Sequence, residues 1–305
     1  MEAGIEITAT LRLDKTFDER FREEVRRCDV VIINGEGTMH HDAVGALVIT
    51  HAGVMAARLG VPVALINTVW QDNIQAIDLL SSCQWISTRE SISRDAIVGA
   101  GFFARVVPDL TLSSDPASLY ANVEPLGGVV VMDDVRLEVS LMLAQYAKAR
   151  GLPFFPMGGR PSLRTVTGLV KWARLGLASR CTTQFHMGQV ETIKRASLVV
   201  TGRFHGVCLA ILAKRPFIAF ASNTYKIEGL LKDANLGPAG RLLADPPLDP
   251  LERNAFIDQS IDQVMAYMRL PANRAAYEDA CEVYLQNARQ SVRSMFEGIV
   301  CIGLR

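Results

Sequence analysis

Short runs of β-branched and other apolar residues alternate with longer segments of helical periodicity along most of the chain. In the first part, such runs predict strands at 29–33, 61–66, 85–88 and 104–107, with a helix over 43–59. Strands that alternate with helices in this way are typical of a parallel sheet whose two faces are both covered. The first part of the chain is therefore expected to be a Rossmann-like unit.

The pattern starts again after residues 121–128, where Asn122, Pro125 and the Gly127-Gly128 pair predict a linker. Beyond it, strand–helix units return, and a Pro-rich stretch then leads into two polar helices. The expected strands are 129–132, 152–156, 198–200 and 216–220, and the expected helices are 137–149, 204–213, 225–232, 252–268 and 273–296. We therefore predict an α/β fold with two Rossmann-like domains that face each other across a cleft, and with C-terminal helices.

The 305 residues fit two domains, and the 32 basic and 32 acidic side chains give a formal net charge of zero. A nucleic-acid-binding protein normally shows a basic stripe, so we predict no nucleic-acid partner. No run of about 18 apolar residues is free of charge, and the pattern therefore predicts no transmembrane segment. The N-terminus also lacks a basic region followed by an apolar stretch, so no signal peptide is expected.

The six cysteines form no CxxC pair, and Cys28, Cys83 and Cys208 lie inside apolar segments. Reduced thiols in a cytosolic protein are therefore favoured over a disulfide framework or a zinc site. We expect a cytoplasmic protein, and peripheral association with the inner face of the membrane stays open.

A cation and an imidazole open an otherwise apolar helix at Arg203-Phe204-His205. In open α/β sheets, ligands bind beyond the carboxyl ends of strands, where the free N–H groups and dipole of the next helix favour an anion. Arg203 could fork onto a carboxylate or phosphate, and His205 could donate to the same anion or transfer a proton. Lys226 opens the next helix, so the three side chains should converge on one crevice if their strands are neighbours. The weaker alternative is two solvated helix-end charges and a structural histidine.

A second polar cluster follows the first strand, where two glycines fit a tight turn with a close backbone approach. Its spacing is not GxGxxG, so a dinucleotide site is weakly supported, and adjacent histidines on a turn are a poor metal signature. We predict no metal and no cofactor. A rim that hydrogen-bonds a hydroxylated substrate and a plain turn capped by Asp42 are about equally supported. The candidate residues are Asn34, Gly35, Glu36, Gly37, His40 and His41, with Glu36 or a histidine as candidate base.

Two further charged residues follow expected strands. Arg89 could reach the cleft, although a surface ion pair is nearly as well supported. Asp109, which follows Pro108, is expected to cap the next turn rather than to accept from substrate hydroxyls.

Taken together, these segments resemble the polysaccharide pyruvyl transferase family over residues 29–237. The most specific part is the apolar strand that ends at Thr201-Gly202 and continues into Arg203-Phe204-His205. The other similar segments are the strand and turn over 29–42, Arg89-Glu90 with Ser93, Val107-Pro108-Asp109, Ala210, Pro216, and Tyr225-Lys226 with Gly229.

The resemblance implies a fold like that of the GT-B glycosyltransferases. It also implies transfer of the enolpyruvyl group of phosphoenolpyruvate to two hydroxyls of a sugar in a polysaccharide or its precursor, forming a pyruvate ketal and releasing phosphate. Arg203 would hold an anionic group, His205 would bind phosphate or act as the acid, and Lys226 would neutralise the leaving phosphate. The turn that contains Glu36 would face the acceptor, and Arg89 would bind substrate. The implied partners are phosphoenolpyruvate and a saccharide acceptor, and a lipid-linked acceptor or a homo-oligomer would be compatible.

By the same resemblance, residues 1–122 form the acceptor-side domain, 123–250 the donor-side domain, and 251–305 helices that pack across the domains. The family usually begins with a strand and an Asn-x-Gly-Asp loop, and this chain starts after that point. The first strand is therefore expected to be missing or truncated. The adjacent Tyr225-Lys226 pair also departs from the wider spacing of the family.

Two other functions stay open. A GT-B-type glycosyltransferase would use the same helix N-termini and basic residues for the diphosphate of a nucleotide sugar, and Glu228 could accept from a ribose. Against it, no aromatic base-stacking loop is evident near Tyr225. A catalytically silent subunit of a polysaccharide assembly system would also fit a missing first strand.

Overall fold

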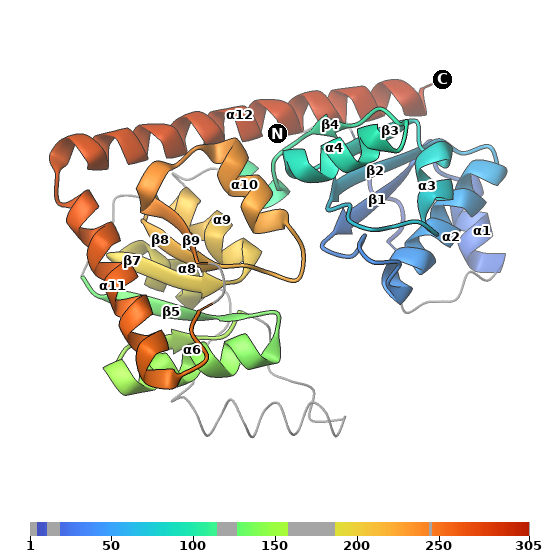
Figure 1. Ribbon diagram of the computed structural model, residues 1–305. Coiled ribbons are helices and arrows are strands. Elements are labelled where there is room, and N and C mark those ends of the chain that lie inside the picture. Colours follow the sequence, from blue (N-terminus) through green and yellow to red (C-terminus); the bar gives the residue numbers. More distant parts are fainter. Residues whose placement is uncertain (1–4, 11–18, 115–126, 158–186, 244–245, 305) are drawn as a thin grey trace. The chain divides into compact units, whose positions relative to one another are not determined.

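The computed structural model has two compact units, each built around a parallel sheet (Figure 1). It describes residues 5–10, 19–114, 127–157, 187–243 and 246–304. Unit 1 comprises Met1–Ser113, Thr224–Asp233 and Gln286–Arg305, and unit 2 comprises Ser114–Asn223 and Ala234–Leu285. The segment expected to link the two domains lies mostly outside the described residues. No helix in the described part of the chain is both long and apolar enough to cross a bilayer.

Unit 1 contains a four-stranded parallel sheet in which spatial order follows sequence order, β1-β2-β3-β4. Each strand is followed by a helix or a short turn, as the alternating pattern predicts. Strand β2 is buried along its whole length, which explains its unbroken apolar run. The strands are β1 (Val31–Glu36), β2 (Val63–Thr68), β3 (Trp85–Thr88) and β4 (Arg105–Val106), and the helices are α1 (Glu19–Arg26), α2 (Val44–Arg58), α3 (Ile77–Ser82), α4 (Ser91–Gly99) and the 3₁₀ turn η1 (Leu110–Ser113).

Strand β1 runs three residues further than the pattern predicts. Asn34 and Glu36 pair with Ile66 and Thr68 of β2, so the expected glycine-rich turn starts only at Gly37. The glycine at position 35 marks a close approach within the sheet, because a Cβ there would lie 2.3 Å from the Thr68 hydroxyl oxygen.

Unit 2 contains a five-stranded parallel sheet in the order β6-β5-β7-β8-β9. The chain adds β6 on one side of β5 and then returns to add β7 on the other side. The sequence pattern predicts four of these strands and misses β9, which is short and begins with a glycine. The strands are β5 (Val129–Asp134), β6 (Phe154–Phe155), β7 (Leu198–Gly202), β8 (Phe217–Phe220) and β9 (Gly240–Leu243), and the helices are α6 (Leu137–Arg150), α8 (Met187–Arg195), α9 (Phe204–Leu212), α11 (Pro250–Met268) and the 3₁₀ turn η2 (Gly237–Ala239).

The C-terminal helix α12 (Pro271–Gly303) contributes to the core of each unit with a different part of its length. In its first part, which belongs to unit 2, the Tyr277 hydroxyl donates to the Arg215 carbonyl oxygen at 2.6 Å. Its last part belongs to unit 1, where Met295 and Ile299 pack with Ile66 of β2. Of the cysteines in apolar segments, Cys208 is fully buried, whereas Cys28 and Cys83 are only partly buried.

Helix α10 (Lys226–Ala234) packs against unit 1 although it follows β8 of unit 2 in sequence. Its Gly229 lies against the buried carboxylate of Glu90, the N-cap of α4, which accepts from the Ser93 N–H at 3.0 Å. Asp233 accepts from the Ser91 N–H at 2.8 Å, which ties α10 to the first turn of α4. The resemblance landmarks Arg89-Glu90-Ser93 and Lys226–Gly229 are thus two sides of one packing contact.

Replacement of Gly229 by alanine should destabilise unit 1. A Cβ at position 229 would lie 2.2 Å from a Glu90 carboxylate oxygen, and that side chain is fully buried and held by Ser93. We expect Gly229→Ala to lower the free energy of unfolding by about 1–3 kcal/mol, measured by chemical denaturation.

Gly99→Ala is the matched control, because Gly99 ends α4 and a Cβ there meets nothing within 4 Å. This variant should be more stable than wild type by about 0.5 kcal/mol, since alanine restricts the unfolded chain. Equal effects of the two substitutions would contradict the packing contact.

Candidate functional site

The carboxyl ends of β5 and β7 lie side by side at the point where the strand order of unit 2 reverses. Asp134, the last residue of β5, pairs with Gly202, the last residue of β7. In open α/β sheets this switch point leaves a crevice in which ligands bind. Strands β7 and β8 are also neighbours, as the sequence argument required. Arg203 and His205 therefore lie at the edge of the sheet where a ligand is expected.

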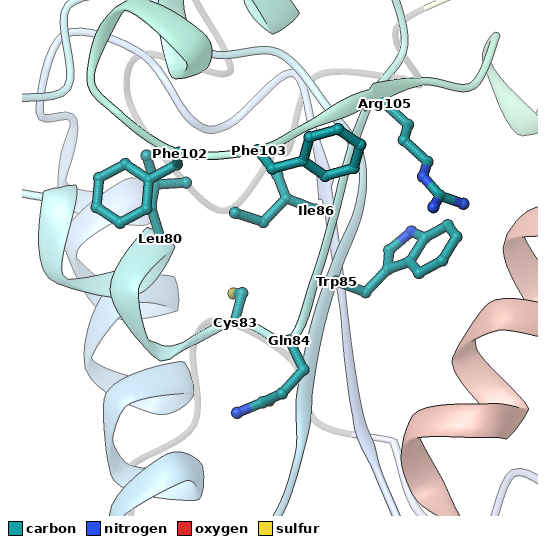
Figure 2. Close-up of a pocket in the computed structure, with 8 residues that line it drawn as sticks. All are labelled: Leu80, Cys83, Gln84, Trp85, Ile86, Phe102, Phe103 and Arg105. Atoms are coloured by element: carbon teal, nitrogen blue, oxygen red, sulfur yellow. The ribbon is translucent and has the colours of Figure 1, made fainter.

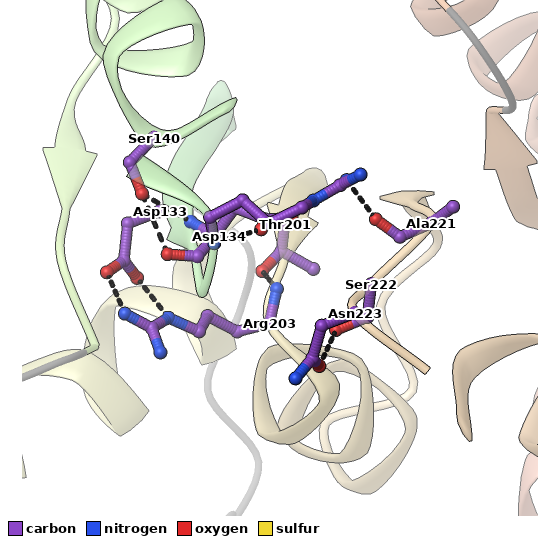
Figure 3. Close-up of polar contacts among 9 residues, drawn as sticks. Asp133, Asp134, Ser140, Thr201, Arg203, Ala221, Ser222 and Asn223 are labelled. Atoms are coloured by element: carbon purple, nitrogen blue, oxygen red, sulfur yellow. Dashed lines mark hydrogen bonds and ion pairs between the residues drawn. The ribbon is translucent and has the colours of Figure 1, made fainter. Parts of the chain in front are cut away.

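Arg203 is the N-cap residue of α9, and its side chain is held by a carboxylate from β5 (Figure 3). Its Nε donates to Asp133 Oδ1 at 3.0 Å and its Nη2 to Asp133 Oδ2 at 2.5 Å. Its backbone N–H donates to the Thr201 hydroxyl oxygen at 3.0 Å. The guanidinium is thus a partner in a bidentate ion pair, and a solvated helix-end charge, the weaker alternative, does not describe it. Its side chain keeps 19% of its surface exposed, whereas that of Asp133 keeps 3%.

Asp134 and Arg136 complete this edge of the sheet, and sequence reasoning missed both. Asp134 Oδ1 accepts from the backbone N–H of Arg136 at 2.6 Å and from its Nε at 3.3 Å. Arg136 Nη2 also donates to the carbonyl oxygen of Ala221, just beyond β8. Burial raises the pKa of the Asp134 carboxyl. A cation that follows an apolar strand and precedes a helix was the signal that identified Arg203, and it was equally present at Arg136.

The backbone at Gly202 packs closely against the side chain of Asp134. A Cβ at position 202 would lie 1.9 Å from Asp134 Oδ2, so only glycine lets β7 approach the Asp134 side chain. His205 is the second residue of α9 and is partly buried. Its ring lies edge-on to the ring of Phe204, with 5.6 Å between the ring centroids.

Unit 1 carries a second charged cluster at the carboxyl edge of its own sheet. Arg89, just beyond β3, forms an ion pair with Asp109 at 3.4 Å, and their side chains are 2% and 1% exposed. The alternative for Arg89, a surface ion pair, is therefore correct about the ion pair but wrong about its exposure. Asp109 also accepts from the Thr111 N–H at 3.0 Å, which is the predicted capping role. Arg89 Nη2 and Lys226 Nζ lie 3.3 and 3.9 Å from the position of a Cβ on Gly37, so both cations lie close to the turn and the approach of Arg89 is the tight one.

Lys226 belongs to unit 1, whereas Arg203 and His205 belong to unit 2. It follows β8 of unit 2 in sequence, but its helix α10 packs with unit 1. The physical reason is the pairing of α10 with the start of α4 through Gly229 and Asp233. The expected site residues thus come from both units, and the convergence of Lys226 with Arg203 and His205 stays a prediction.

The turn after β1 gathers the other expected residues of unit 1. The Nδ1 atoms of His40 and His41 lie 3.0 Å apart, and His41 Nε2 lies 3.3 Å from the Asp72 carboxylate. The pKa of His40 is lowered, first by burial and then by the charges of His41 and Lys226. Among the described residues, no three His, Cys, Asp or Glu side chains are grouped as metal ligands would be.

Left-handed backbone conformations are concentrated around this turn. Five of the seven described residues other than glycine with positive φ lie at the carboxyl ends of β1 and β2 or in the segments that follow them. Such conformations are strained in residues with a Cβ and cluster at functional sites. Asn34 also accepts from the Asn67 amide at 3.1 Å and donates to the Glu36 carboxylate at 3.4 Å. The five residues are Glu36, His41, Asp42, Asn67 and Asp72.

A cavity of about 240 Å³ in unit 1 lies at the opposite edge of the sheet (Figure 2). Trp85 and Arg105, which line it, are the first residues of β3 and β4, and the guanidinium of Arg105 stacks 4.5 Å from the centre of the Trp85 ring. Ligands of open α/β sheets bind at the carboxyl ends of the strands, so this cavity is separate from the charged cluster of unit 1.

Solved structures with a similar fold are GT-B enzymes, as the sequence prediction states. The UDP-GlcNAc 2-epimerase of Methanocaldococcus jannaschii, solved with UDP-GlcNAc and UDP, is 12% identical with a TM-score of 0.53, over 85% of this chain and 75% of that one. MnaA of S. aureus, solved with UDP, is 11% identical with a TM-score of 0.53, over 94% and 82%. The glycotransferase of kitacinnamycin is 15% identical with a TM-score of 0.51, over 94% and 77%. At these identities the likeness shows the fold alone.

No curated protein matches the sequence. The family model for polysaccharide pyruvyl transferases matches residues 5–224, which is more than half of the chain and includes the strand, Arg203 and His205 of unit 2. The same range includes the turn after β1 and the Arg89 region of unit 1. The chain therefore belongs to the polysaccharide pyruvyl transferase family, a family of transferases.

Proposed function

We propose that this protein transfers the enolpyruvyl group of phosphoenolpyruvate to two hydroxyls of a saccharide, with the donor bound at the carboxyl edge of the unit 2 sheet. The observation that carries the proposal is the position of Arg203 and His205 at the start of α9, beside the switch point between β5 and β7. The family match supports a pyruvyl transfer reaction.

The chemistry of the donor fits the charges at this edge. Phosphoenolpyruvate carries a phosphate and a carboxylate on a small skeleton, and it needs more than one cation for binding. Arg203 and Arg136 follow neighbouring strands, and the N-terminus of α9 adds unpaired N–H groups. We assign Arg203 to an anionic group of the donor and His205 to proton transfer.

The reaction balances without a redox cofactor. The methylene carbon of phosphoenolpyruvate takes a proton, and the adjacent carbon becomes cation-like. One sugar hydroxyl attacks that carbon and loses its proton. The carbon–oxygen bond to phosphate then breaks, and a second hydroxyl closes the ketal while its proton leaves with the phosphate. Overall, two hydroxyl protons end on the new methyl group and on phosphate.

The unit 1 cluster is proposed to contact the acceptor. The end of β1 contributes Asn34 and Glu36, and the turn after it contributes the two histidines, all of which suit the hydroxyls of a saccharide. Arg89 and Lys226, both near Gly37, would bind an anionic group of a substrate. A lipid-linked or polymeric acceptor would be compatible with this assignment.

A nucleotide-sugar glycosyltransferase is the second candidate. The observation in its favour is that two of the solved structures with this fold hold UDP, one of them together with UDP-GlcNAc. A donor-binding experiment distinguishes the two functions.

Phosphoenolpyruvate should raise the melting temperature of the wild-type protein, and UDP-GlcNAc should not. A ligand at 100 times its dissociation constant stabilises a protein by about 2.7 kcal/mol, which is readily measured as a thermal shift. Arg203→Ala should abolish the shift relative to its own ligand-free melting temperature. Arg150→Ala is the matched control, because Arg150 also forms a bidentate pair, with Asp258 on the outer helices of unit 2, and it should retain the shift. Stabilisation by UDP-GlcNAc alone would support the glycosyltransferase instead.

His205→Gln should abolish turnover while phosphoenolpyruvate binding changes by less than about threefold. General acid catalysis contributes about 10²–10⁴-fold, so a loss of that size in phosphate release is expected with an accepting saccharide. Calorimetric titration measures the binding step separately. Equal losses of binding and turnover would instead make His205 an anion ligand.

A further inference from the structure

Asp133 links three segments at the carboxyl edge of the unit 2 sheet. It belongs to β5, and its Oδ1 accepts from the backbone N–H of Met157, beyond β6, at 2.8 Å. The same oxygen accepts from Arg203 Nε at 3.0 Å, and Oδ2 accepts from Arg203 Nη2 at 2.5 Å. The side chain is 3% exposed, so this carboxylate has a fixed position within the fold.

The bidentate contact between Asp133 and Arg203, the Asp133 fork, determines which part of the Arg203 guanidinium faces outward. A guanidinium has five N–H donors in one plane, and Asp133 occupies the Nε edge and one Nη2 position. Figure 3 shows the third nitrogen pointing away from the carboxylate. Among the described residues, Nη1 makes no hydrogen bond, and the side chain remains 19% exposed. The Nη1 edge is therefore the part of the guanidinium that is available to a ligand.

We infer that Asp133 is a positioning residue of the donor site, which holds Arg203 so that its Nη1 edge binds the anionic donor. The inference rests on the proposed function, because it assumes that Arg203 is a donor ligand. It adds that the donor anion binds the arginine alongside Asp133 and does not displace it. A long arginine side chain without this fork would have to be ordered by the ligand itself, at a cost in affinity.

The opposite arrangement, in which the donor displaces Asp133 from Arg203, conflicts with the burial of the carboxylate. Without Arg203, Asp133 would be a buried carboxylate that has lost its bidentate partner, beside Asp134, which is also buried. Breaking a buried ion pair in this way is strongly unfavourable. The charge of Arg203 also favours the ionised form of Asp134, so its departure would affect both carboxyls.

The test is the affinity for phosphoenolpyruvate of Asp133→Asn, measured by phosphorus NMR titration, which reaches millimolar dissociation constants. The amide keeps the shape and one oxygen but loses the charge and half of the fork. We expect the dissociation constant to rise at least tenfold. Asp258→Asn is the matched control: it removes the same kind of fork from Arg150 in the same unit and should leave the affinity unchanged.

A double-mutant cycle separates positioning from a general loss of structure. In an Arg203→Gln background, Asp133→Asn should change the dissociation constant by less than about twofold, because Asp133 acts through Arg203. A merely structural role of Asp133 would weaken binding equally in both backgrounds. If Asp133→Asn does not fold, Asp133→Glu keeps the charge and moves the fork by one methylene, and the same loss of affinity is expected.

An unchanged or tighter affinity of Asp133→Asn, with a wild type that binds phosphoenolpyruvate, would overturn the inference and leave the proposed function standing. Tighter binding would mean that the carboxylate competes with the donor. A wild type that binds neither phosphoenolpyruvate nor inorganic phosphate would overturn the proposed function and the inference together.

Discussion

The ion pair between Arg203 and Asp133 is the contact on which the donor edge of unit 2 depends. It joins the first residue before α9 to the end of β5, and the Met157 N–H adds the segment beyond β6. The pair exists only because the strand order reverses beside β5, so that β7 becomes its neighbour. Gly202 completes the arrangement, since a larger residue would displace the Asp134 side chain from the same edge. The strand order and the buried carboxylate of Asp133 thus determine the position of Arg203.

The second constraint is the return of α10 to unit 1. Gly229 fits against Glu90, and this contact brings Lys226 to the turn at Gly37, close to Arg89. Two segments that resemble the family, although they are far apart in sequence, therefore pack against each other. Each unit then has a charged cluster at the carboxyl edge of its sheet, which is where ligands of open α/β sheets bind.

Much of this arrangement could be predicted from the sequence. The strand–helix alternation gave both parallel sheets, and the position of Arg203 and His205 after an apolar strand placed them at a ligand-binding edge. The extension of β1 through Asn34 and Glu36 could not be predicted from the sequence, because a glycine such as Gly35 is as typical of a turn as of a close contact between strands. The partner of Arg203 lies 70 residues away, and its identity depends on strand order, which local patterns do not encode. The packing of Lys226 with unit 1 could not be predicted either, because it depends on a contact between segments that are far apart in sequence.

The central claim, that the unit 2 edge supports pyruvyl transfer from phosphoenolpyruvate, is tested most directly by following the carbon that becomes the ketal. Phosphoenolpyruvate labelled with ¹³C at that carbon would be incubated with the protein and a panel of saccharides, and the label observed by NMR. The account predicts that the alkene carbon signal converts into a ketal signal as phosphate is released in equal amount. Release of nucleotide from a nucleotide sugar, with the labelled donor unchanged across the panel, would contradict it.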